Sequence, residues 1–103
     1  MHRFRIHVQV RYGHFAEHLE VCEQLNELAR SRGWIESTFW VPTVGIGNEI
    51  IIETDYPDLA TFQREGDAFS SDPDAMKLLR STSELVVEGS ARSELLELAP
   101  TLA

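Results

Sequence analysis

The stretch RFRIHVQVR, residues 3–11, decides the fold of this chain. Its apolar and polar side chains alternate at every position, which is the period of a β-strand with one covered face. The apolar face carries Phe4, Ile6, Val8 and Val10, and the opposite face carries Arg3, Arg5, His7, Gln9 and Arg11. We therefore expect helices to pack on the apolar face and to leave a histidine in the middle of the other face.

The alternation stops at Gly13, and residues 14–32 change to helical spacing. Apolar side chains recur there at steps of three or four residues and form one stripe, which consists of Phe15, Leu19, Cys22, Leu25 and Ala29. Gly33 follows directly, as is typical of a helix C-terminus. Cys22 is the only cysteine and belongs to this stripe, so we predict a small core residue rather than a nucleophile.

The rest of the chain predicts three more strands and three more helical segments. Pro42 limits hydrogen-bond donation near the second strand and favours an edge position for it, whereas Ile50-Ile51-Ile52 is typical of a central strand. The expected ranges are strands at 36–42, 48–54 and 84–88, a helix that begins at Pro57, a short helix after Asp72, and a last short helix at 93–99.

This order predicts an α+β domain of the βαββαβ type. Two right-handed crossovers give a four-stranded antiparallel sheet of order 4-1-3-2 with both main helices on one face. We expect one domain over residues 1–103, with its core in 3–89 and a short helix or tail in 90–103.

The face away from the helices is expected to carry bulky apolar groups beside its polar ones. Neighbours in a strand point to opposite faces, so either Phe39 or Trp40, and either Ile50 or Ile51, must lie on that side. A mixed face of this kind is rarely left open on a monomer. A second copy, related by a two-fold axis, is the simplest cover and predicts a homodimer through the sheet face.

Four stretches resemble one known family. VRYGHF at 10–15, GIGNEI at 45–50, ETDYPDLATF at 53–62 and SDPD at 71–74 follow one another as in the dimeric α+β barrel superfamily, and the chain is most similar to NIPSNAP-like proteins. The resemblance implies a ferredoxin-like fold and two facing sheets that enclose a lumen. Relatives include cofactor-independent monooxygenases, polyketide cyclases, haem-handling proteins and isomerases, so it implies little about the reaction.

His7 is the candidate catalytic residue, as an acid or base at the middle of the lumen face. Glutamates are expected beside it, at 49 and 53 from the third strand and at 84 and 88 from the fourth. Arg5 would hold an anionic oxygen, and the full set of expected substrate-binding residues is Arg5, Gln9, Trp40, Ile51 and Val86. The ligand would be a small apolar or aromatic molecule, with no tightly bound organic cofactor.

A second hypothesis is a dimeric scaffold or accessory protein with a closed lumen. In that case Arg5 and His7 pair with the glutamates and nothing binds. The two hypotheses differ in whether the face holds a cavity of roughly 300 Å³ or more, the size of a ligand pocket.

Other classes of partner are disfavoured. The formal net charge of −8 and the absence of a basic stripe argue against nucleic acid and anionic membranes. No apolar run is long enough to span a bilayer, so the cytoplasm is the expected location.

His14 and His18 match H-x-x-E-H with Glu17, but the chain is too small for the enzymes that use this pattern, so no metal site is predicted. Haem binding rests on family analogy alone, with His7, His14 or His18 as possible ligands.

Overall fold

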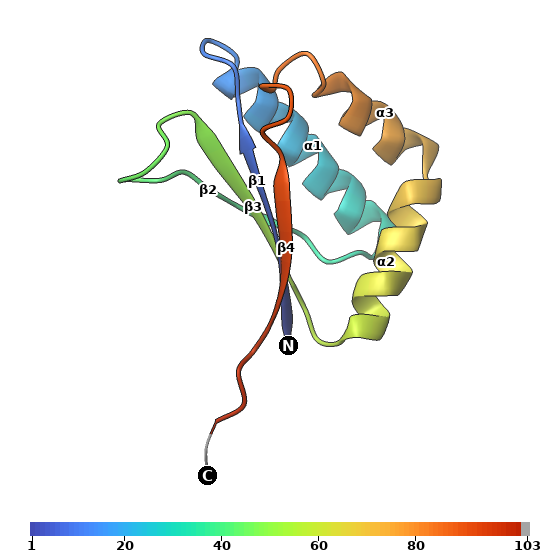
Figure 1. The fold of residues 1–103 in the computed structure, drawn as a ribbon. Coiled ribbons are helices and arrows are strands. Elements are labelled where there is room, and N and C mark those ends of the chain that lie inside the picture. The colour runs from blue at the N-terminus through green and yellow to red at the C-terminus, as the bar shows by residue number, and fades with distance from the viewer. Residues whose placement is uncertain (102–103) are drawn as a thin grey trace.

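A computed structural model describes residues 1–101 as one antiparallel sheet covered on one side by three helices (Figure 1). The sheet order is β2-β3-β1-β4, which confirms the predicted topology with β1 and β3 at the centre. In chain order the elements are β1 (His2–Gln9), α1 (Phe15–Arg32), β2 (Thr38–Trp40), β3 (Glu49–Tyr56), α2 (Leu59–Ser71), α3 (Pro73–Ser81) and β4 (Arg92–Glu97).

The core lies between β1, β3 and α1. Val8, Val10, Cys22 and Ile50 are its buried residues, and Ile50 has no exposed surface. The alternation of β1 therefore directs its apolar side chains to the helices, as predicted. Burial also raises the pKa of the Cys22 thiol to about 11, so the cysteine is a core residue and not an activated nucleophile.

The ends of the helices follow the local signals in the sequence. Gly33 ends α1 with φ of 74°, a conformation that favours glycine. The Asp72 carboxylate caps α3 by accepting hydrogen bonds from the backbone N–H groups of Asp74 and Ala75. Arg32 also binds Asp72, with Nε 2.8 Å from Oδ2, which ties the end of α1 to the start of α3 and holds the pKa of Asp72 below its ordinary value.

The prediction for the last part of the chain was wrong. The fourth strand is Arg92–Glu97, where a helix was expected. Residues 84–88, where the fourth strand was expected, form a turn with one isolated bridge, between Val86 and Val10. β4 pairs with β1 over six positions, from His2 opposite Glu97 to His7 opposite Arg92. The unpaired N–H and C=O groups of a central strand need this partner, and that need outweighs a weak local preference for helix.

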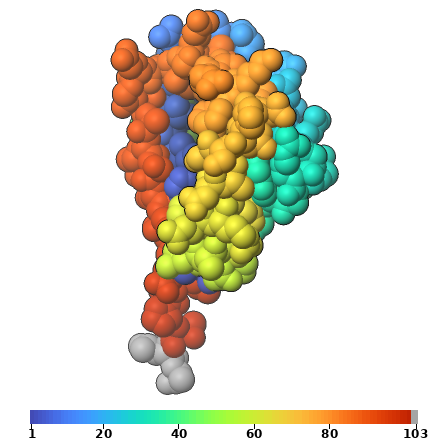
Figure 2. Space-filling view, turned by 90° about the vertical axis from the view of Figure 1, so that its right-hand side faces the viewer, coloured from blue at the N-terminus to red at the C-terminus, as the bar shows by residue number. Residues whose placement is uncertain are grey.

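The helical side and the open side of the sheet differ in cover. Figure 2 views the helical side, where α2 and α3 lie over the sheet, β4 runs along one edge and residues 98–101 extend below the body. No element of residues 1–101 covers the other side. Within the same residues, no helix combines the length and the apolar character needed to cross a membrane.

Candidate functional site

The open side of the sheet collects the polar residues of β1 and their cross-strand partners. The register between β1 and β3 sets Arg5 opposite Glu53, His7 opposite Ile51 and Gln9 opposite Glu49. These are the β3 partners expected for His7 and its neighbours. Trp40 is opposite Ile51 on the other edge, so an indole, an isoleucine and an imidazole lie in one row across three strands.

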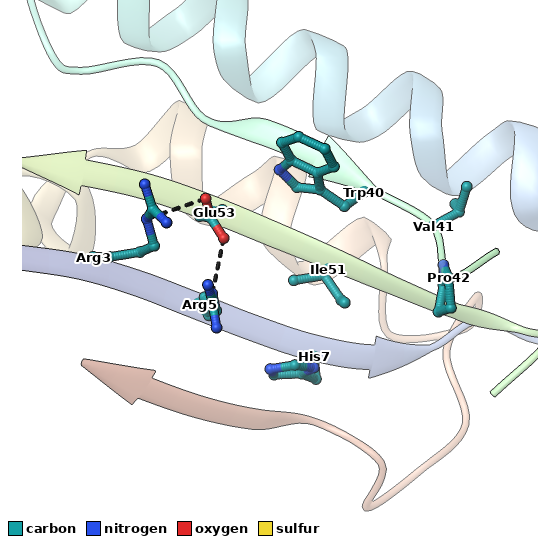
Figure 3. Close-up of a pocket in the computed structure, with 8 residues that line it drawn as sticks. All are labelled: Arg3, Arg5, His7, Trp40, Val41, Pro42, Ile51 and Glu53. Carbon is teal, nitrogen blue, oxygen red and sulfur yellow. Dashed lines mark hydrogen bonds and ion pairs between the residues drawn. The ribbon is translucent and has the colours of Figure 1, made fainter. Parts of the chain in front are cut away.

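A hollow of about 430 Å³ lies over this row. Figure 3 shows the side chains that line it, namely Arg3, Arg5, His7, Trp40, Val41, Pro42, Ile51 and Glu53. Its size falls within the usual range for small-molecule pockets, roughly 300–1,000 Å³. Apolar walls stand on the β2 side and charged groups stand on β1, so the hollow presents both an aromatic surface and hydrogen-bond donors.

Carboxylates already hold the two arginines of the hollow. Arg5 Nε donates to Glu53 Oε2 at 2.8 Å, and Arg3 Nε donates to Asp55 Oδ1 at 2.7 Å (Figure 3 draws the contacts of both arginines with Glu53). The Arg3 guanidinium holds the pKa of Asp55 below its ordinary value, because it hydrogen-bonds the ionised form. The Arg5 guanidinium is therefore fixed in place and partly neutralised.

His7 lies between two carboxylates. Its Nδ1 is 3.3 Å from Glu49 Oε1 on β3, and its Nε2 is 3.1 Å from Glu94 Oε1 on β4. The His7 side chain is only 13% exposed, against 31% for Glu94. The hydrogen bond from His7 holds the pKa of the Glu94 carboxyl below its ordinary value. An imidazole donates at both nitrogens only in its protonated form, so a neutral His7 donates to one of the two carboxylates at a time.

The structure brings together four of the six predicted site residues. Arg5, His7, Trp40 and Ile51 line the hollow. Gln9 lies two residues beyond His7 on β1, and its backbone N–H donates to Ser90 Oγ. Val86 packs against the core cluster, because the segment that carries it is not the fourth strand.

Two polar residues of the site were missed by sequence reasoning. Arg3 shares the parity of Arg5, so the alternation of β1 already contained the signal for it. Glu94 was assigned to a helix, and the glutamates expected in its place, Glu84 and Glu88, lie in the turn region before β4. No local signal could have found Glu94, since its position depends on which segment pairs with β1.

The H-x-x-E-H residues lie apart from this site. His14 contacts Glu17 through Nδ1 at 3.2 Å on the outside of α1. His18 is only 3% exposed, and its Nδ1 is 3.6 Å from the Cys22 sulfur. In the part of the chain that the structure describes, no three histidine, cysteine or acidic side chains gather as metal ligands would.

We expect His18 to make the fold less stable in mild acid. Burial lowers its pKa below the ordinary value of 6.5, so the unfolded chain takes up a proton that the folded chain resists. Stability is then fully present above pH 6.5 and decreases as pH falls below it, by at most about 1.4 kcal/mol per pH unit for one proton. Urea unfolding between about pH 7.5 and pH 5.5 measures this slope.

His18→Leu should flatten the slope, because it removes the buried imidazole. Equal slopes in the wild type and His18→Leu would show that other groups cause the acid sensitivity.

Comparisons with known proteins support the fold. No family model and no curated protein sequence matches the chain. Among solved structures, it is similar to an uncharacterised NIPSNAP domain protein from Burkholderia xenovorans, with 14% identity, a TM-score of 0.79, and coverage of 100% of this chain and 99% of that one. A NIPSNAP family protein from Agrobacterium tumefaciens is 16% identical, with a TM-score of 0.76 and coverage of 95% and 92%. An antibiotic biosynthesis monooxygenase is 13% identical, with a TM-score of 0.74 and coverage of 97% and 100%. At these identities the likeness shows a shared ferredoxin-like α+β fold, which confirms the fold that the sequence resemblance implied.

Proposed function

We propose that this chain, which shares its fold with NIPSNAP domain proteins and an antibiotic biosynthesis monooxygenase, works as a homodimer whose facing sheets enclose a chamber for a small molecule. The ligand is small, partly aromatic and carries a neutral oxygen. His7 transfers a proton to or from it, in the cytoplasm and without a tightly bound organic cofactor.

The hollow over His7 is the observation that carries the proposal. About 430 Å³ of space lies over a titratable imidazole that has an indole and an isoleucine in the same row. A site of this composition suits an aromatic ring, with its polar substituent directed to His7 and Arg5. The sequence alone suggested an anionic oxygen for Arg5, but Glu53 already occupies its guanidinium, so a neutral oxygen fits better.

The surface area of the protomer supports dimerisation. The chain exposes 7017 Å², whereas a compact monomer of 11.7 kDa exposes about 5,900 Å². Its radius of gyration of 14.4 Å also exceeds the roughly 12.8 Å expected for its length. Residues 98–101, which extend after β4, contribute to this surplus of about 1,100 Å² together with the open face of the sheet, which is the face that a second copy would cover.

The charges of the open face also suit a second copy. Three arginines lie there against four carboxylates, a formal balance of −1 on a chain of −8; these residues are Arg3, Arg5, Arg92, Glu49, Glu53, Asp55 and Glu94. Most of the excess negative charge therefore lies elsewhere, on the helices and loops. Two copies can face each other through this side with little repulsion.

Glu94 is the group that a ligand would displace from His7. It lies on the edge strand β4, is more exposed than Glu49, and also has Arg92 and Arg5 within 4 Å as alternative partners. When Glu94 moves to an arginine, Nε2 of His7 turns to the ligand while Glu49 still orients Nδ1. A carboxylate-oriented imidazole of this kind is the common form of a general acid or base.

The scaffold hypothesis remains the alternative, and one observation favours it. Arg5 and both nitrogens of His7 already have carboxylate partners within the chain, as that hypothesis expects. A dimer without a ligand would then use these contacts only to hold its strands together.

Native mass spectrometry of untagged, freshly purified protein tests the proposal. We expect a dimer that carries one or two equivalents of a small organic molecule, released when the protein is denatured. His7→Ala should remain dimeric and lose the extra mass, because the donor that holds the ligand is gone. A monomer would refute the chamber, and a dimer that takes up no compound from a set of small phenols and aromatic ketones would favour the scaffold.

A further inference from the structure

The loop between β2 and β3 forms an apolar arm, which we define as residues 41–47. Val44 is 94% exposed, Val41 57% and Ile46 49%. In Figure 1 the arm extends away from the helices, on the side of the sheet that the helices leave open. Apolar side chains exposed to this degree in one short loop are typical of a contact surface.

The arm has a defined shape. Gly45 adopts φ of 148°, and a Cβ at this position would come within 3.1 Å of Pro42 Cβ. The backbone N–H of Glu49 donates to Ile46 O at 3.2 Å and closes the base of the arm. The loop is therefore folded upon Pro42, and Val44 points outward because of this turn rather than from a lack of structure.

A second hollow lies at the opposite corner of the same face. It has a volume of about 170 Å³ and is lined mainly by Met1, Arg3, Arg5, Leu96 and Leu98. Leu96 lies on the edge strand β4, opposite Arg3 near the start of β1. The arm follows Trp40 on the other edge strand, β2, and lies toward the far end of β1. Arg3 and Arg5 line both hollows, so the second hollow adjoins the chamber over His7.

Symmetry relates the two corners. A two-fold axis between facing sheets reverses one direction in the plane of the sheet and keeps the other. The arm and the second hollow lie at the two ends of one diagonal of the sheet. A two-fold axis along the other diagonal therefore places the arm of one copy over the second hollow of its partner. The strands of the two copies then cross near a right angle, which is one of the two usual ways in which sheets pack.

We propose that the arm of each copy docks in the second hollow of its partner, with Val44 against Leu96 and Leu98, and that it closes the chamber beside Arg5. This inference rests on the proposed homodimer. It adds that a loop of the partner, and not only its sheet, forms one wall of the chamber. A ligand then enters or leaves only when an arm lifts.

Charge placed on the arm tests the docking. Val44→Glu should fold normally, since Val44 touches little in its own chain, and should raise the dimer dissociation constant by at least about 10-fold. Leu79→Glu is the matched control: Leu79 is 45% exposed and lies on α3, on the helical side, so this variant should dimerise like the wild type. Sedimentation equilibrium measures both.

Disulfide trapping tests the register. The Val44→Cys, Leu98→Cys double variant should form a covalent dimer under mild oxidation, and each single variant should stay monomeric on a non-reducing gel. Cys22 is only 2% exposed and does not compete. Cross-linking of Val44→Cys alone would show that the two arms meet each other and would overturn the inference, as would a Val44→Glu dimer of unchanged strength. A wild-type monomer would instead refute the proposed function itself.

Discussion

Ile50→Ala should lower the free energy of unfolding by about 2–5 kcal/mol, the range for truncating a fully buried isoleucine. Ile50 has no exposed surface and packs with Val8, Val10 and Cys22 between the sheet and α1. A domain of this size has only about 5–15 kcal/mol of stability, so the variant would lose a large fraction of it. Urea unfolding followed by circular dichroism gives the difference.

Ile51→Ala is the matched control for this experiment. The two isoleucines are neighbours in β3, but Ile51 points to the open side and lines the hollow over His7. Its truncation should weaken the dimer and leave the packing of the protomer intact. The loss of stability should therefore depend on protein concentration for Ile51→Ala and hardly depend on it for Ile50→Ala. Equal, concentration-independent losses would contradict the assignment of the two faces.

His7→Ala should slow turnover of the chamber's ligand by roughly 10²–10⁴-fold, the usual contribution of a general acid or base. The substitution leaves Glu49 and Glu94 without the imidazole that lies between them. The pKa of the Glu94 carboxyl should then rise toward its ordinary value, because the hydrogen bond from His7 is the main cause of its depression. A rate assay with the molecule recovered by native mass spectrometry and a carbon NMR titration of Glu94 give the two readouts.

Glu94→Gln separates proton transfer from structural support. The amide keeps an oxygen beside His7 and removes the charge, so the rate should fall much less than in His7→Ala. The depressed pKa of Glu94 also means that its contact with His7 stabilises the fold above pH 4.5, the ordinary pKa of this carboxyl. The stabilisation is lost as the pH falls below that value. A wild-type dimer that neither binds nor converts a ligand, together with a loss of about 1–3 kcal/mol of stability in His7→Ala, would establish the scaffold alternative.

The sequence by itself determined the parts of this protein that depend on local spacing. The alternation of residues 3–11 predicted β1, the helical stripe ended by Gly33 predicted α1, and Pro42 predicted that the second strand lies at an edge of the sheet. Periodicity reports which side of an element is covered, and turn residues report where it ends, so both are visible without a structure. The placement of Arg5 and His7 on one face followed from the same alternation, and in the structure Trp40 and Ile51 line the hollow beside them.

Only the tertiary structure decided which segment completes the sheet. Residues 92–97 have a sequence that suits a helix as well as a strand, and they form β4 because the free edge of β1 needs a hydrogen-bonding partner over six positions. The pairing of residues 92–97 with β1 places Glu94 beside His7, and Val86 packs against the core instead of the open face. Pairing of residues 85 or more positions apart carries no local signal. The partner of the imidazole, and with it the chemistry of the site, was therefore set by the fold as a whole.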